Sequence, residues 1–164
     1  MIKAVIFDLD GTLVNLPINY SELFQEFSRI AGIPKVQPIT RLLSEVNTKT
    51  RTAIFEVWDR AELVAWEKAT IIQEGARLYK KYLKKPRVLI TMQGRAITEL
   101  ITKELNLSFI WVITREDSYD RIQQLQIAIH KLNTPSRQIL FVGNTDGDSE
   151  AAKAVGCRFL RVKI

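Results

Sequence analysis

Two aspartates near the start of the chain, Asp8 and Asp10, are spaced so that both carboxylates can act at one place. They follow an apolar run at residues 5–7, and alternate residues of an extended segment lie on one face. Gly11 then lets the backbone turn sharply beside a ligand. Two neighbouring carboxylates repel each other unless a cation joins them, and magnesium prefers hard oxygen ligands together with phosphate oxygens. One aspartate could attack phosphorus while the other transfers protons. A simple polar turn is the alternative.

The Asp-x-Asp-Gly-Thr segment at residues 8–12 resembles the first motif of the haloacid dehalogenase (HAD) superfamily, which consists mainly of magnesium-dependent phosphatases. Two later segments resemble further motifs of this superfamily, in the same order. Residues 87–91 look like a buried strand that ends in a phosphoryl-binding hydroxyl, here Thr91. Residues 139–148 look like the motif that usually carries Gly-Asp and then another aspartate, here Asp148.

The resemblance implies a role for each of these residues. Asp8 would be the nucleophile that forms an aspartyl-phosphate, and Asp10 would be the acid/base, with its backbone carbonyl also binding Mg²⁺. Thr91 and backbone amides near Gly11 would hold the phosphoryl oxygens, and Asp148 would support the metal. Thr91 could instead be an ordinary strand-end hydroxyl, and Asp148 could cap the helix that follows it.

Two positions depart from the superfamily pattern. Asn144 stands where an aspartate is usual, so a neutral amide replaces a charged metal ligand and weakens the expected magnesium binding. The usual lysine between the second and last motifs is missing. Arg121 is the best substitute as a catalytic and phosphate-binding cation, and Arg115 is the second choice. Arg121 could otherwise form a surface pair with Asp117. The expected metal ligands are Asp8, Asp10, Asn144 and Asp148.

The periodicity of apolar residues predicts alternating strands and helices. Strands are expected at residues 2–7, 88–90, 109–112, 139–142 and 158–162. Helices are expected after Pro17 up to a stop at Gly32, at 39–47, at 49–57, and from a cap at Asp59 to residue 83, where Gly75 could divide the last one. This alternation predicts an α/β fold, a Rossmann-like parallel sheet flanked by helices. The strand ends would then bring Asp8, Thr91 and Asp148 together.

The helical segment has the size and position of the small cap that many members of this superfamily insert after their first motif. The expected domains are therefore a HAD-like core at residues 1–14 and 76–164 and a helical cap insertion at 15–75. A chain of 164 residues, 46% of them hydrophobic, favours one well-packed core with a small appendage over two full domains.

Charge and composition limit the expected partners. The net charge of +6 and pI near 9.5 raise the possibility of polyanion binding. Much of the excess lies in a cluster at the end of a predicted helix, formed by Lys80, Lys81, Lys84, Lys85 and Arg87. No aromatic residues interleave it, so we expect a solvated face and no specific nucleic-acid partner. No apolar run approaches the roughly 20 residues that span a bilayer, so we expect a cytoplasmic protein without membrane contact. The single cysteine, Cys157, is expected to be buried and unreactive.

The sequence therefore predicts a magnesium-dependent phosphatase that hydrolyses a small phosphorylated metabolite through an aspartyl-phosphate, similar to phosphoglycolate phosphatases. Dehalogenation and phosphonate cleavage are less favoured because the Asp10 acid/base of phosphatases is present. Asn144 and the missing lysine motivate an alternative, a catalytically impaired HAD-like binding or regulatory protein. A nucleic-acid-binding module would instead show steeply salt-dependent association.

Overall fold

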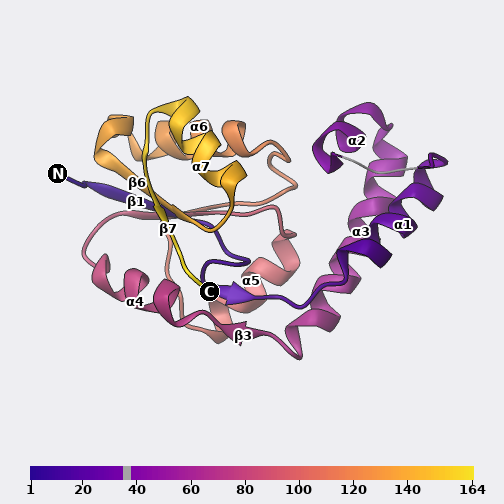
Figure 1. Ribbon diagram of the computed structural model, residues 1–164, viewed down its shortest axis with the longest axis horizontal. Coiled ribbons are helices and arrows are strands. Elements are labelled where there is room, and N and C mark those ends of the chain that lie inside the picture. The colour runs from indigo at the N-terminus through magenta and orange to yellow at the C-terminus, as the bar shows by residue number, and fades with distance from the viewer. Residues whose placement is uncertain (35–37) are drawn as a thin grey trace. The chain divides into compact units, whose positions relative to one another are not determined.

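The chain folds into two compact units. The computed structural model describes residues 1–34 and 38–164 (Figure 1). Residues 1–15 and 70–164 form the first, here the sheet unit, and Leu16–Ala69 form the second, here the helical unit. The helical unit ends before residue 75, because Thr70–Ile71 (β3) pairs antiparallel with Val14–Asn15 (β2) of the sheet unit.

The sheet unit is built on five parallel strands in the order β5-β4-β1-β6-β7. Their bounds are Ala4–Phe7 (β1), Arg87–Ile90 (β4), Trp111–Ile113 (β5), Ile139–Gly143 (β6) and Arg158–Arg161 (β7). The central strands β1 and β6 are buried along their whole length, as expected when helices cover both faces of a parallel sheet. The predicted α/β fold with a parallel sheet flanked by helices is confirmed.

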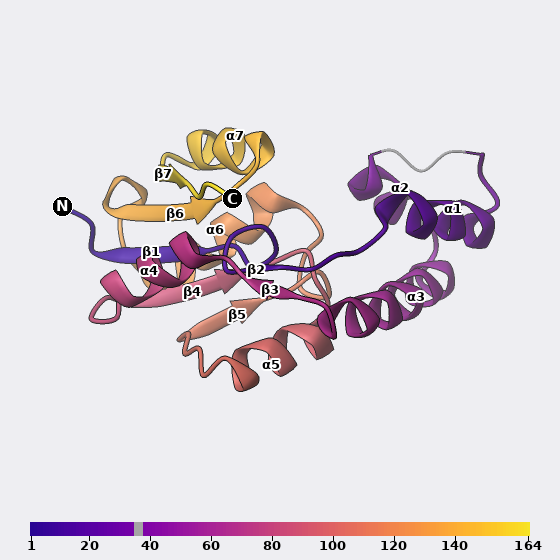
Figure 2. The ribbon, with the colours of Figure 1, turned by 60° about the horizontal axis from the view of Figure 1, so that its bottom comes forward.

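Four helices cover the sheet: α4 (Gln73–Lys81), α5 (Arg95–Glu104), α6 (Arg121–Leu132) and α7 (Asp146–Val155). In Figures 1 and 2, α6 and α7 lie over one face, and α4 and α5 lie over the other. The alternation of side chains along β1 fits this arrangement. Ile6 packs in one core with residues of α6 and α7, whereas Phe7 contacts Tyr79 of α4 with ring centroids 6.0 Å apart.

The helical unit contains α1 (Tyr20–Ala31), α2 (Ile39–Glu45) and α3 (Thr48–Trp66). Asn19 caps α1 and Asn47 caps α3, each accepting a hydrogen bond from a backbone N–H of the first turn. As the sequence predicts, α1 stops at Gly32, whose φ of 70° suits a left-handed helix end. Within the unit, Phe27 of α1 packs on Trp58 of α3 with ring centroids 5.4 Å apart.

Three predicted element boundaries are wrong. The helix α3 runs without a break to Trp66, so Asp59 lies inside it and caps nothing. The chain leaves the helix at β3, and a new helix begins at Gln73, so no helix spans 59–83. Gly75 lies in the first turn of that new helix, where a Cβ would come within 1.8 Å of the Thr12 carbonyl oxygen. The glycine therefore permits close helix–loop packing. The strand predicted at 109–112 is shifted to Trp111–Ile113, which pairs with β4.

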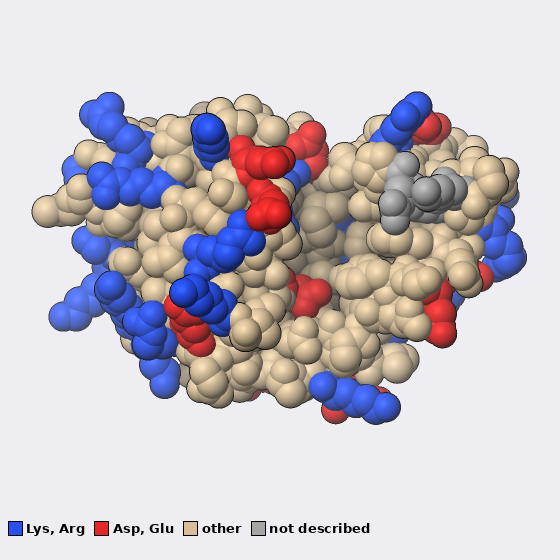
Figure 3. Space-filling model, viewed as in Figure 1, with Lys and Arg blue, Asp and Glu red and all other residues tan. Residues whose placement is uncertain are grey.

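Basic side chains are frequent on the visible face of the sheet unit (Figure 3). Lys80, Lys81 and Lys84 are exposed, as expected for a solvated face. Arg87 differs from them. Its guanidinium donates to the carbonyl oxygens of Tyr82 at 3.2 Å and Ser108 at 3.0 Å and lies over the ring of Tyr79, so it holds the start of β4 in place. In the part of the chain that the structure describes, no helix is long and apolar enough to cross a membrane.

Candidate active site

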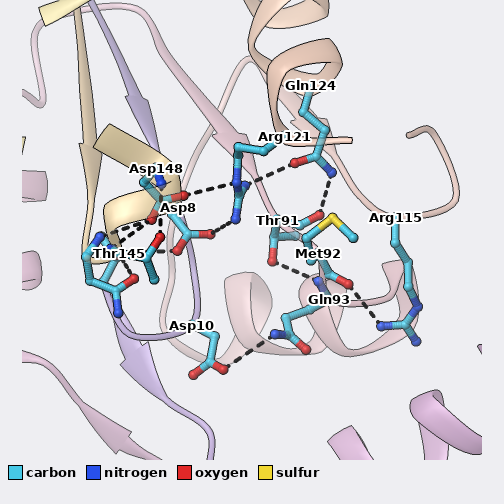
Figure 4. A network of polar contacts seen from close by, with 12 residues as sticks. Asp8, Asp10, Thr91, Met92, Gln93, Arg115, Arg121, Gln124, Thr145 and Asp148 are labelled. Carbon is cyan, nitrogen blue, oxygen red and sulfur yellow. Dashed lines mark hydrogen bonds and ion pairs between the residues drawn. The ribbon is translucent and has the colours of Figure 1, made fainter. Parts of the chain in front are cut away.

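The candidate site lies at the carboxyl edge of the sheet, entirely within the sheet unit (Figure 4). Asp8 follows β1 directly, Thr91 follows β4 and Asn144 follows β6. Arg121 is the first residue of α6, and Asp148 lies in the first turn of α7. Open α/β sheets bind ligands at this edge, where loops from several strands meet.

Asp8 occupies the centre of the polar network. Its side chain is only 6% exposed, and its Oδ1 lies 3.2 Å from Nη2 of Arg121. Thr12 donates to Oδ2 at 3.4 Å. Burial raises the pKa of Asp8 to about 7; the Arg121 charge opposes this rise and the carboxylate of Asp148 adds to it. The carboxylate is therefore held in a site where added positive charge would favour its ionised, nucleophilic form.

Arg121 bridges two carboxylates. Its Nη2 contacts Asp8, and its Nε lies 3.1 Å from Oδ1 of Asp148. Arg121 is the first residue of α6 and directly follows Asp120, which caps the helix. The start of the helix therefore directs the Arg121 side chain toward the ends of the strands. The alternative surface pair with Asp117 does not form, because Asp117 pairs with Arg95 at 2.6 Å.

Arg115, the second choice for the missing lysine, lies elsewhere. It is fully buried, and its Nη1 donates to the Met92 carbonyl oxygen at 3.2 Å. In Figure 4 it lies on the far side of Met92 from Arg121. Arg121 is therefore the residue of the two whose charge reaches the carboxylate pair.

Asp148 caps α7, as one of the two expected roles requires, and also reaches Arg121. Its Oδ2 accepts from the backbone N–H groups of Asn144 and Thr145, both at 3.2 Å, and its own N–H donates to Oγ1 of Thr145 at 3.0 Å. This reciprocal pair is a capping box at the start of α7. The other oxygen, Oδ1, pairs with Arg121. The cap fixes the carboxylate in the site.

Gly11 and Asn144 pack directly against each other. Gly11 has φ 78°, and a Cβ there would lie 2.2 Å from Nδ2 of Asn144. The Gly11 N–H donates to the Val14 carbonyl oxygen at 2.7 Å. Thr12 donates to Oδ1 of Asn144 at 3.5 Å. The Asp146 side chain is 90% exposed and pairs with Arg161, whose Nη1 donates to the Asn144 carbonyl oxygen at 2.9 Å.

Gln93 links the two remaining predicted residues. Thr91 is fully buried, and its Oγ1 accepts from the Gln93 N–H at 3.0 Å. The Gln93 side chain donates to Oδ2 of Asp10 at 3.5 Å. Asp10 is turned away from Asp8 and Asp148 in Figure 4. Gln93 is not among the predicted site residues, although its position two residues after Thr91 is a usable signal.

Gln124 is also absent from the predicted site residues. It is fully buried in α6 and accepts from Nη1 of Arg121 at 3.0 Å. Its Nε2 donates to the carbonyl oxygens of Thr91 and Ser118, each at 2.8 Å. The signal was its spacing of three residues from Arg121 in a predicted helix, which places both side chains on one helix face.

The donor set suits magnesium in chemical type, because it consists of carboxylate and amide oxygens. Within residues 1–34 and 38–164, however, no three His, Cys, Asp or Glu side chains are grouped closely enough to hold a metal ion. Asp8 and Asp148 are joined through Arg121. A magnesium ion would therefore need this carboxylate pair to be completed by neutral oxygens, from the Asn144 amide and the Asp10 backbone.

Comparison with known proteins gives a family match over most of the chain. Residues 5–162 match the model of the family described as haloacid dehalogenase-like hydrolase. A phosphoglycolate phosphatase of Pseudomonas savastanoi pv. phaseolicola is 30% identical to this chain, over an alignment that covers 94% of the chain and 66% of the relative. The chain therefore spans just under two thirds of the length of this relative.

Solved structures show the same fold. A hydrolase from Pseudomonas syringae is similar with a TM-score of 0.74 and 20% identity, covering 96% of this chain and 82% of that one. CbbY from Rhodobacter sphaeroides, solved in complex with phosphate, is similar with a TM-score of 0.66 and 17% identity, covering 97% and 85%. At such identities the likeness shows the shared fold alone.

Proposed function

Since the chain belongs to the haloacid dehalogenase-like hydrolase family, we propose that it is a cytoplasmic, magnesium-dependent phosphatase acting on a small phosphorylated metabolite. The observation that carries this proposal is the buried Asp8 carboxylate, held 3.2 Å from Arg121, which also pairs with Asp148. This arrangement gives a nucleophile with an elevated pKa, a fixed positive charge beside it and a second carboxylate for a metal.

In the proposed reaction, an oxygen of Asp8 attacks the phosphorus of a phosphate monoester and the bond to the ester oxygen breaks. Asp10 gives a proton to that leaving oxygen, and the product alcohol departs. Asp10 then takes a proton from water, which attacks the aspartyl-phosphate, releases phosphate and restores Asp8. The Asp10 carboxylate is oriented by Gln93 at 3.5 Å.

The surrounding residues would stabilise the transferring phosphoryl group. Arg121 supplies positive charge beside Asp8, as the superfamily lysine would, and Thr91 supplies a hydroxyl at the end of β4. Gly11 already donates its N–H to Val14, so its contribution would be to let the backbone approach the phosphate closely. Magnesium bound by Asp8, Asp10, Asn144 and Asp148 would add further positive charge at the phosphate.

The relatives suggest the class of substrate. Curated relatives named phosphoglycolate phosphatase match 94% of this chain, which supports a small phosphorylated acid as the first candidate. We further propose that the segment at residues 15–75, which contains the helical unit, serves as a cap. The alternative, a catalytically impaired binding or regulatory protein, rests on Asn144 and on the missing lysine. Arg121 weakens it, because the missing lysine has a replacement that reaches Asp8.

The test is phosphate release from a panel of phosphomonoesters: phosphoglycolate, sugar phosphates and nucleoside monophosphates, with magnesium and with a chelator. We expect release that requires magnesium and is lost in Asp8→Asn. Asp146→Asn is the matched control, because Asp146 is 90% exposed and pairs with Arg161 and not with Asp8, Arg121 or Asp148. Equal, negligible release by the native protein and Asp8→Asn across the panel would favour the impaired binding protein.

A further inference from the structure

We propose that Gln124 is a positioning residue, which fixes the guanidinium of Arg121 relative to the Thr91 end of β4. The inference rests on the proposed phosphatase function and extends it to a residue that touches none of the reacting atoms. Gln124 lies one helical turn after Arg121 in α6, with its side chain between that arginine and β4 (Figure 4). Its role would be to keep the two groups that hold the phosphoryl oxygens at a fixed separation.

Both the oxygen and the nitrogen of the Gln124 amide form hydrogen bonds. Its Oε1 accepts from Nη1 of Arg121 at 3.0 Å, and its Nε2 donates to the carbonyl oxygens of Thr91 and Ser118 at 2.8 Å each. The side chain is fully buried, so water does not compete for these bonds. The carbonyl oxygens of Thr91, at the end of β4, and of Ser118, in the loop before α6, therefore bind the same amide group.

The chemistry of the partners requires an amide at this place. Carbonyl oxygens accept only and a guanidinium donates only, so the joining group must donate on one side and accept on the other. This requirement also fixes the orientation of the amide, with nitrogen toward the carbonyls and oxygen toward Arg121. A carboxylate at position 124 would have no donor for Thr91 and Ser118, and an apolar side chain would leave both carbonyls and Nη1 of Arg121 without this partner.

Arg121 is held through all three of its side-chain nitrogens. Its Nη2 pairs with Asp8, its Nε pairs with Asp148 and its Nη1 donates to Gln124. Asp8 and Asp148 would both exchange contacts during turnover, if they carry the phosphoryl group and the metal. The Gln124 contact is the one that is independent of substrate. It would therefore keep the guanidinium in place when its ion pairs change.

The kinetic test is a double-mutant cycle with Gln124→Met and Arg121→Met. We expect Gln124→Met to lower kcat by about 100-fold, the loss that a misplacement near 1 Å can cause, with a smaller change in KM. In the Arg121→Met background the same substitution should cost about twofold or less. An equal fold loss in both backgrounds would show that Gln124 acts through general stability, and it would overturn the proposal.

Thr98→Val is the matched control for this cycle. Thr98 is also fully buried in a helix of the sheet unit and donates to a backbone carbonyl, that of Gly94 at 2.7 Å, but it contacts neither Arg121 nor Asp8. Its replacement should leave kcat within about twofold. If Gln124→Met does not fold, Gln124→Asn keeps a buried amide that is too short to span the same partners, and the same non-additivity with Arg121 is expected.

A spectroscopic readout tests the positioning without turnover. In ¹H–¹⁵N spectra, the Nη1–H resonances of Arg121, identified by their loss in Arg121→Met, should exchange slowly with solvent in the native protein and in Thr98→Val, because Nη1 is the nitrogen that donates to Gln124. They should exchange rapidly or broaden in Gln124→Met, and unchanged resonances there would overturn the proposal. If the native protein releases no phosphate from any ester, the proposed function fails, and this measurement alone decides whether Gln124 holds Arg121.

Discussion

Arg121 and Asp8 are 113 positions apart in the chain, and their side chains lie 3.2 Å apart at the carboxyl edge of the sheet. The contact depends on two features of the fold. Asp8 follows β1, the central strand, and Arg121 begins α6, where Asp120 caps the helix and sets the direction of its first side chain. A cation thus reaches the proposed nucleophile although the chain lacks the usual lysine at this point.

Replacement of Arg121 should remove most activity. We expect Arg121→Met to lower kcat by about 100- to 1000-fold, because a positioned charge at the transferring group is lost from a site with little water. Steady-state kinetics on the best substrate of the panel measure this loss. Arg77→Ala is the control, since Arg77 is 65% exposed and pairs only loosely with Glu74. A loss below about threefold in Arg121→Met would show that the guanidinium has no part in catalysis.

Asp8 should make stability depend on pH. Its pKa is raised from 3.8 to about 7 in the folded protein, chiefly by burial. Between these two values the folded state binds a proton that the unfolded state does not. Protonated Asp8 therefore contributes to the free energy of unfolding. The contribution is fully present below pH 3.8 and is lost as the pH rises through 7. The loss corresponds to about 4 kcal/mol.

Asp8→Asn removes this titration. With a chelator present, we expect the variant to be more stable than the native protein at pH 8, by up to about 4 kcal/mol, with the difference shrinking as the pH falls toward 4. Urea unfolding at several pH values measures it. Asp146→Asn, at an exposed position, should show no such trend. A constant difference between Asp8→Asn and the native protein at all pH values would contradict the raised pKa.

Asn144→Asp should strengthen magnesium binding. The substitution adds a third negative charge close to Asp8 and Asp148, beside the Gly11 backbone. We expect the magnesium concentration for half-maximal activity, and the Kd from calorimetry, to fall about tenfold, equivalent to about 1.4 kcal/mol. Asp146→Asn should leave both values unchanged. Unchanged magnesium affinity in Asn144→Asp would indicate that this side chain does not contact the metal.

Two glycines should respond in opposite ways to alanine. At Gly75 a Cβ would lie 1.8 Å from the Thr12 carbonyl oxygen, a backbone atom that cannot move aside, so we expect Gly75→Ala to lower the free energy of unfolding by about 3 kcal/mol. At Gly147, in α7, the nearest atom would be 3.7 Å away. Gly147→Ala should raise the free energy of unfolding by about 0.5 kcal/mol. Thermal or urea unfolding distinguishes the two, and equal effects would contradict this packing.

The sequence predicts the sheet unit well because each strand is a short apolar run that ends at a turn. All five strands of the parallel sheet lie within two residues of the expected bounds. The helical segment is predicted less accurately. Apolar spacing continues through residues 49–66, so nothing local marks Asp59 as internal, and the short strand β3 forms only because Val14 pairs with Ile71 across the insertion.

In the candidate site, too, local sequence predicts some residues, whereas others depend on contacts between distant parts of the chain. Asp8, Thr91 and Asp148 follow from strand ends and motif spacing, and they lie at the sheet edge as expected. The direction of the Arg121 side chain does not follow from the sequence, because it depends on the crossover that brings α6 against β4 and β5. Gln124 is the clearest example of a residue that the sequence does not predict. Its role depends on the carbonyl oxygens and the guanidinium that surround its amide in the folded protein.

Phosphate bound covalently to Asp8 would be the direct evidence that this aspartate is the nucleophile. The native protein is mixed with a radiolabelled phosphomonoester and magnesium, quenched in acid within the first turnover, and the labelled peptide is identified. We expect label on the peptide that contains Asp8, and none in Asp8→Asn. Rapid phosphate release without label on that peptide, or equal labelling of Asp8→Asn, would contradict nucleophilic catalysis by Asp8.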